Sequence, residues 1–188
     1  MLFRSEAGKS TLQGRKLWFD DKFGRLNTEE KGQYLGSFED EKIIVFYIDG
    51  TYELTDTEIT QRFEADKIVL IEQFDPEKII SAVYLDADKN QFNIKRFKIE
   101  TTTLKTQLQF IKEGEGNRLE AVTTDPEPIL VVQTCRGQQV RKAKFKVAKM
   151  VEVTGWKTVG AKLTDYSKTI EMEWEQKSGG ATPQTELF

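Results

Sequence analysis

Short runs of alternating apolar and polar residues, separated by turn residues, cover most of this chain. The clearest turn is Asp49 and Gly50, a dipeptide typical of β-hairpins, which separates the apolar run Lys42–Ile48 from Thr51–Leu54. Gly14–Asn27 alternates in the same way about a turn near Asp21. Both segments therefore predict β-hairpins.

Most of the remaining chain also has the pattern of strands. Further strands are expected at residues 68–73, 79–85, 91–99, 106–111, 129–134, 140–147, 149–153 and 158–163. Helical periodicity is nearly absent. The best helix candidate is Asp56–Phe63, about two turns long, in which Ile59 and Phe63 would share one face. The pattern as a whole predicts an all-β protein.

Two short sequences recur before apolar runs. Glu41–Ile44 (EKII) returns as Glu77–Ile80, and the tripeptide DPE at 75–77 returns at 125–127. Units of about 36 to 50 residues that each carry several strands predict propeller-like blades, about four in this chain. We expect the apolar run to be the inner strand of each blade, and the recurring aromatics Phe97 and Phe145 to pack between neighbouring sheets.

The repeating pattern ends before the C-terminus. Residues Glu175–Phe188 lose the alternation and gain Gly, Ser, Pro and Thr. We therefore expect one domain over residues 1–174, followed by a flexible tail over 175–188 without a role in the core.

Composition excludes several classes of enzyme. The chain of 188 residues has no histidine and one cysteine, Cys135, which removes His-based nucleophile systems, His-ligated zinc, four-cysteine zinc sites and disulfides within the chain. No apolar run approaches the ~18 residues of a membrane span, and no secretory signal is visible. These features favour a cytoplasmic binding module without metal or cofactor, and leave carboxylate or lysine chemistry as the remaining catalytic options.

The formal net charge of −3 hides an uneven distribution of charge. Glu39–Asp66 has nine acidic and two basic residues, Lys89–Lys112 has six basic and one acidic, and Arg136–Lys162 has eight basic and one acidic. A basic stripe on one part of a surface is what phosphate binding requires. The alternative is that these lysines solvate the outward faces of strands and protect their edges from aggregation.

Because the basic clusters recur at a similar place in two repeats, we expect them to lie along one rim that follows a curved polyanion. The residues expected to contact phosphates are Lys89, Lys95, Arg96, Lys98, Arg136, Arg141, Lys142, Lys144, Lys146 and Lys149. Four of them, Arg141, Lys142, Lys144 and Lys146, are expected on a single strand.

Several motifs resemble functional sites only in part. Gly8–Ser10 and Gly155–Lys162 each lack elements of a phosphate-binding P-loop, and Asp86–Asn90 opens like a calcium loop but lacks its glycine and its final glutamate. We interpret all three as turns, and Cys135 as a structural thiol. The tryptophans are expected to pack in cores or between blades rather than stack on bases; they are Trp18, Trp156 and Trp174.

Four segments together are similar to the C-terminal domain of the A subunit of bacterial DNA gyrase and topoisomerase IV. They are Gly14–Asp20 (GRKLWFD), Lys31–Gly36 (KGQYLG), Phe74–Ile79 (FDPEKI) and Val153–Leu163 (VTGWKTVGAKL). The resemblance runs from about residue 12 to 174 and includes the pattern ILVVQTCRG at 129–137, followed by a basic strand. Any one segment is weakly specific, whereas their order and spacing are fairly specific.

This resemblance implies a β-pinwheel, whose propeller-like blades have a basic rim that bends duplex DNA with little sequence preference. It also implies a parent enzyme, located at the nucleoid, in which the A subunit pairs with another A subunit and with a B subunit that hydrolyses ATP with Mg²⁺. The catalytic tyrosine of the family lies N-terminal to the pinwheel, and no tyrosine here has its context. The chain is therefore expected to be a non-catalytic later portion of the pinwheel.

Two departures from the family leave alternatives open. The arginine-rich box of gyrases, Gln-Arg-Arg-Gly-Gly-Lys-Gly, does not occur, which favours a role like that of topoisomerase IV over supercoiling. The acidic stretch Glu39–Asp66 departs from a uniformly basic rim, so the chain could instead be a protein-interaction module that works through its acidic face. A carboxylate-based enzyme is a third, more remote alternative.

Overall fold

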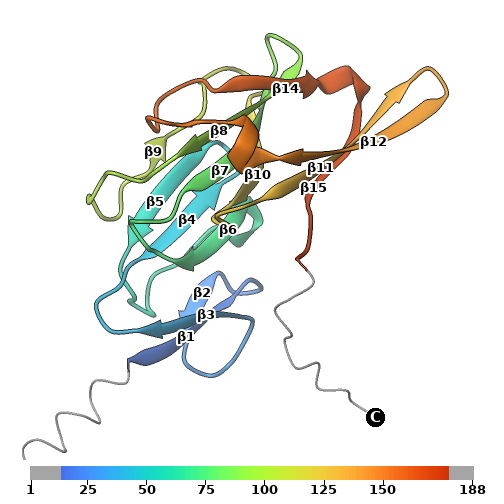
Figure 1. Cartoon of the computed structure of the whole chain (residues 1–188). Coiled ribbons are helices and arrows are strands. Elements are labelled where there is room, and N and C mark those ends of the chain that lie inside the picture. The colour runs from blue at the N-terminus through green and yellow to red at the C-terminus, as the bar shows by residue number, and fades with distance from the viewer. Residues whose placement is uncertain (1–13, 178–188) are drawn as a thin grey trace, which may run out of the picture.

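Four sheets follow one another along residues 14–177, the part of the chain that this computed structural model describes (Figure 1). Sheet 1 has the order β2-β1-β3 and consists of β1 (Arg15–Asp20), β2 (Arg25–Asn27) and β3 (Gln33–Phe38). Sheet 2 has the order β6-β4-β5-β9 and consists of β4 (Ile43–Tyr47), β5 (Thr51–Thr55), β6 (Ile68–Gln73) and β9 (Leu108–Gln109).

The second half of the chain completes two more sheets. Sheet 3 has the order β10-β7-β8-β13, with β14 also paired to β8; its strands are β7 (Ile80–Asp86), β8 (Gln91–Phe97), β10 (Arg118–Thr123), β13 (Val153–Thr154) and β14 (Ala161–Asp165). Sheet 4 has the order β12-β11-β15 and consists of β11 (Ile129–Arg136), β12 (Gln139–Lys146) and β15 (Thr169–Trp174). All strand pairs are antiparallel except β13 with β8. The predicted all-β fold with about four repeat units is thus confirmed.

Helical structure is confined to single turns within the described range. They are η2 (Ala65–Lys67), α2 (Val147–Met150) and η3 (Tyr166–Lys168). The helix expected at Asp56–Phe63 is wrong, because these residues form turns and extended chain. The strand expected at 149–153 is also wrong in position, since α2 occupies its start and β13 begins only at Val153. None of the helices in residues 14–177 has the length and hydrophobicity to cross a membrane.

Three hydrophobic cores lie between consecutive sheets and explain the continuous apolar runs. In β4, Ile43 and Val45 pack with sheet 1, whereas Ile44 and Phe46 pack with sheet 3. The same alternation in β7 sends alternate side chains into the core shared with sheet 2 and the core shared with sheet 4. A strand that is buried on both faces has no polar side to show, so its sequence reads as one apolar run.

These apolar strands are central in their sheets, not innermost as expected from the sequence. The strands that contact each other from sheet to sheet are β3 with β6, β6 with β10, and β10 with β15. Three of these four inner strands (β3, β10 and β15) were not predicted, because each exposes part of its length and lacks a continuous apolar run. The described sheets are therefore arranged about an inner line of edge strands.

On its outer side, each of the first three sheets is contacted by a segment of the following repeat. In the sequence, this segment comes after the central hairpin of that following repeat. We call these return segments: residues 57–63 on sheet 1, 104–109 on sheet 2 and 153–165 on sheet 3. The first is held by the Phe63 amide, which donates to the Gly24 carbonyl at 2.8 Å. The second contributes β9 and the third contributes β13 and β14. This exchange ties each repeat to the one before it.

The recurring DPE sequence has the same conformation in both copies. The amide of Glu77 donates to Oδ1 of Asp75 at 2.9 Å, and the amide of Glu127 donates to Oδ1 of Asp125 at 2.9 Å. Such aspartate turns satisfy a backbone donor just before the chain enters a central strand. The repeat seen in the sequence is thus a structural repeat.

Candidate nucleic-acid interface

The outer edge of sheet 4 is a basic strand with one side unpaired in the described range. β12 pairs only with β11 there, and Figure 1 shows their hairpin extending away from the rest of the molecule. Every residue of β12 is exposed except Phe145, which is half-buried against the core between sheets 3 and 4. The expectation that four basic residues share this strand is confirmed.

The register of the hairpin assigns these side chains to the two faces of the sheet. Residues 142, 144 and 146 of β12 lie opposite Gln133, Val131 and Ile129 of β11, on the face turned away from sheet 3. Arg141 lies on the other face, in line with Phe145 but beyond the core. Basic side chains therefore flank the free edge of β12 on both sides.

Six of the ten expected residues are exposed and form no ion pair within residues 14–177. They are Lys89, Arg136, Arg141, Lys142, Lys146 and Lys149. Two others are paired: Lys98 lies 3.3 Å from Glu77, and Lys144 pairs with Glu175. Lys89 lies in the turn between β7 and β8, so the structure gathers the other five on and beside β12.

The remaining two expected residues are buried and cannot reach DNA at the surface. Lys95 is 1% exposed, and its ammonium donates to the carbonyls of Phe110, Trp156 and Thr158 at 2.5, 2.7 and 2.6 Å. Burial lowers the pKa of Lys95 to about 8. Arg96 is 6% exposed and donates to the carbonyls of residues 148 and 151 at 3.4 and 3.2 Å. The sequence prediction was wrong for both.

The error has a simple structural cause. Phe97 pairs with Ile80 in sheet 3 as Phe145 pairs with Leu130 in sheet 4, so Arg96 and Lys144 occupy equivalent positions. In sheet 3 the return segment 153–165 covers β8 on its outer side. No described residue covers β12 in the same way, so the equivalent side chain stays exposed.

The basic edge continues onto the outer side of sheet 3. The chain leaves β12, forms α2 with exposed Lys149, and turns at 155–160 with exposed Lys157, whose ammonium lies 5.0 Å from the centre of the Trp156 ring. Lys157 was not among the expected residues. The local excess of basic residues at 136–162 was the signal that could have included it.

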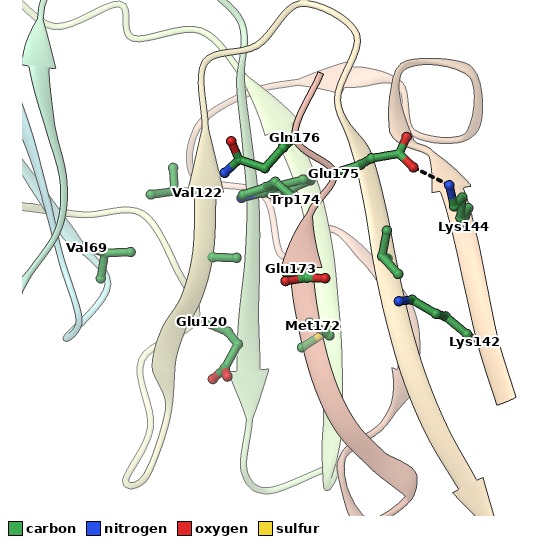
Figure 2. Close-up of a pocket in the computed structure, with 12 residues that line it drawn as sticks. Val69, Glu120, Val122, Lys142, Lys144, Met172, Glu173, Trp174, Glu175 and Gln176 are labelled. Carbon is green, nitrogen blue, oxygen red and sulfur yellow. Dashed lines mark hydrogen bonds and ion pairs between the residues drawn. The ribbon is translucent and has the colours of Figure 1, made fainter. Parts of the chain in front are cut away.

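An open groove of about 600 Å³ lies on the inner side of sheet 4 (Figure 2). Lys142 and Lys144 of β12 line it together with Glu120 of β10, Glu173 of β15 and Glu175, whose carboxylate pairs with Lys144. Val69 of sheet 2 and Val122 of sheet 3 also line the groove. The two edges of sheet 4 therefore differ in charge, with the outer edge basic and the inner edge acidic.

The acidic stretch Glu39–Asp66 is partly neutralised by cations from elsewhere. Lys105 lies 3.1 Å from Asp56 and 3.2 Å from Glu58, and a further contact joins Lys67 to Glu64 at 2.9 Å. Within residues 14–177, no group of three or more acidic or cysteine side chains is arranged to hold a metal ion.

The partial motifs have the structures expected of turns where they are described. Asp86–Asn90 connects β7 to β8, and Gly155–Lys162 leads into β14, whereas Gly8–Ser10 lies outside the described residues. Cys135 is a free thiol, half-buried near the hairpin tip.

Two of the three tryptophans pack as expected. Trp156 packs on the core between sheets 2 and 3, and Trp174 on the core between sheets 3 and 4. Trp18 instead lies beside Tyr34 of sheet 1, with ring centres 4.9 Å apart.

The first described residues of the expected tail contact sheet 4. The amide of Glu175 donates to the Ile129 carbonyl at 2.8 Å, and Lys177 lies 2.7 Å from Asp125. These residues continue the line of β15 instead of leaving the sheet. The expectation for residues 178–188 lies outside the described range.

A row of propeller-like sheets with exchanged outer strands and a basic outer edge defines this chain as a blade-repeat domain. Residues 25–173 match the topoisomerase C-terminal domain family of Bacteroidota, and the chain belongs to this family. The fold is the expected β-pinwheel, since the chain is similar to a crystal structure of the C-terminal domain of DNA topoisomerase IV. The TM-score is 0.55 at 14% identity, and the match covers 93% of this chain but 56% of the other. No curated protein matches.

Proposed function

We propose that this domain binds the backbone of duplex DNA along the outer edge of sheet 4, as a non-catalytic part of a type IIA topoisomerase A subunit. The observation that carries the proposal is the free, basic edge formed by β12 and α2, where Arg141, Lys142, Lys146 and Lys149 are exposed without ion pairs in the described range. Such cations bind phosphate oxygens and release counterions from DNA.

The proposed mode of binding has little sequence preference. Flexible lysines on a strand edge contact phosphates, which position DNA but carry no sequence information. Bending a duplex of tens of base pairs costs on the order of 1–6 kcal/mol, so contacts must extend beyond one strand. Lys157 on the outer side of sheet 3 supplies a continuation of the basic edge in that direction.

The parent enzyme would supply the chemistry. In the proposed assembly, this domain holds DNA beside a cleavage centre elsewhere in the A subunit, and a B subunit hydrolyses ATP with Mg²⁺. The absence of a gyrase-type arginine box from the sequence favours a topoisomerase IV-like role in unlinking and relaxation, at the nucleoid of the cytoplasm.

Charge reversal tests the proposed interface. We expect the variant with Arg141, Lys142, Lys144 and Lys146 changed to Glu to lose binding to a fluorescent random-sequence duplex, because phosphates would meet four negative charges at the edge. A matched control also reverses four charges, those of Lys16, Lys22, Lys31 and Arg62, which are exposed on sheet 1 and its turns or in the loop between β5 and η2. Equal binding by both variants would contradict the proposed interface.

A further inference from the structure

Sheet 4 carries two opposite columns of charge on one face. Lys142, Lys144 and Lys146 form a column on β12, opposite residues 133, 131 and 129 of β11. On the other side of β11, Glu171 and Glu173 pair with residues 133 and 131, and the amide of Glu175 donates to the carbonyl of residue 129. The three lysines and three glutamates therefore stand level with each other across the middle strand.

These columns are close enough to act on the same bound anion. Two strand spacings separate β12 from β15, which is about 9.6 Å. The Debye length at physiological salt is about 8 Å, so a phosphate near the lysines still experiences the glutamates. One contact already bridges the sheet, since Glu175 forms an ion pair with Lys144.

The inner side of sheet 4 is acidic beyond this column. Glu120 of β10, which lies 3.4 Å from Arg118, lines the groove together with Glu173 and Glu175, and its side chain is 34% exposed. Figure 2 shows Glu120 and Glu173 on the side of the groove away from Lys142, whereas Glu175 reaches across to Lys144. A duplex that moved inward from β12 would pass from three lysines to an array of carboxylates.

We infer that the glutamates of β15 are positioning residues that confine DNA to the outer edge of sheet 4. Glu171 and Glu173 repel phosphates from the inner edge, and Glu175 in addition withholds Lys144 from DNA by pairing with it. This inference rests on the proposed function. It adds that the position of the duplex is determined by repulsion from β15 as well as by attraction to β12.

Neutralisation of the column tests the inference. The variant with Glu171, Glu173 and Glu175 changed to Gln is expected to bind a random duplex about tenfold more tightly than wild type at about 100 mM salt. Its slope of log K against log salt should become steeper by about 0.9, because Lys144 gains a phosphate. The control variant changes Glu29, Glu30 and Glu39 to Gln, which alters net charge equally on exposed positions of sheet 1 and the turn after it.

A double-mutant cycle isolates the contribution of Lys144. In a Lys144→Gln background, adding Glu175→Gln should no longer steepen the salt dependence, because no lysine is released. If the triple variant binds no more tightly than its control, the inference is wrong while the proposed function stands. If wild-type protein binds no duplex at low salt, the proposed function is wrong and the inference falls with it.

The position of the duplex can be read directly with the natural cysteine. A DNA-cleaving reagent attached to Cys135, near the tip of the outer hairpin, should cut bound duplex in wild type. The same reagent on Gln176→Cys, in a Cys135→Ser background, lies by the inner groove and should cut weakly. Strong cutting from position 176 while Glu171, Glu173 and Glu175 are intact would overturn the inference. Strong cutting that appears only when these three glutamates are changed to Gln would support it.

Discussion

Lys95 shows how a basic residue can support the basic edge without reaching the surface. Its buried ammonium binds carbonyls at 156 and 158, on either side of exposed Lys157. Arg96 donates to carbonyls at 148 and 151, on either side of Lys149. Both buried cations therefore fix the turns that present surface lysines.

Replacing Lys95 by Met tests this structural role. The apolar stem remains buried, but three carbonyls lose their donor, and each unsatisfied buried acceptor costs about 1–3 kcal/mol. The variant also no longer buries a charge, which offsets part of this cost. We therefore expect the free energy of unfolding, measured by denaturant titration, to fall by about 2–4 kcal/mol. Lys89→Met, in an exposed turn, should change it by less than about 0.5 kcal/mol. Equal stability of the two variants would contradict the role assigned to Lys95.

At the scale of elements, the return segment 57–63 explains why a helical pattern did not produce a helix. Phe63 packs edge-on against Phe19 of sheet 1, with ring centres 5.8 Å apart, whereas Ile59 remains 44% exposed. The two residues thus do not share a buried face. Docking on the neighbouring sheet determines this conformation, and local periodicity carries no information about that contact.

Gly24 is the position where this segment meets sheet 1 most closely. A Cβ there would lie 2.2 Å from the Phe63 carbonyl oxygen, whereas one at Gly137 would meet nothing within 4 Å. Both glycines have similar positive φ values, +61° and +64°, so alanine is strained equally at both. We expect Gly24→Ala to destabilise the fold by about 1–3 kcal/mol more than Gly137→Ala, measured by thermal or denaturant unfolding. Equal losses would show that the contact is easily displaced.

The sequence predicted the central strands well because they satisfy a local rule. Burial on both faces produces the apolar runs of β4, β7 and β11, and the turn at Asp49 and Gly50 marks one hairpin without reference to the rest of the chain. The inner strands β3, β10 and β15 could not be recognised in this way, because their partial burial depends on which sheet lies beside them.

The candidate site was predicted in part for the same reason. The four basic residues of β12 follow from strand alternation alone. Whether an equivalent residue is exposed depends on the return segment of the following repeat, which covers Arg96 but leaves Lys144 exposed. The residues that cover Arg96 are more than fifty positions further along the chain. The sequence around Arg96 therefore does not indicate that it is buried.

For the molecule as a whole, the distribution of charge matters more than its sum. A net charge of −3 coexists with a basic outer edge on sheet 4, because acidic side chains gather on its inner edge and in the stretch Glu39–Asp66. An overall negative domain of this kind would bind DNA in one orientation and resist non-specific contact elsewhere.

The most direct test is to titrate a fluorescent random-sequence duplex of about 40 base pairs with the wild-type chain at several salt concentrations. Six cations follow the outer edge without ion pairs in residues 14–177: Arg136, Arg141, Lys142, Lys146, Lys149 and Lys157. If all six meet phosphates, log K should fall against log salt with a slope of about −5, with no dependence on sequence. A slope near zero, or no binding at low salt, would contradict DNA binding by this edge.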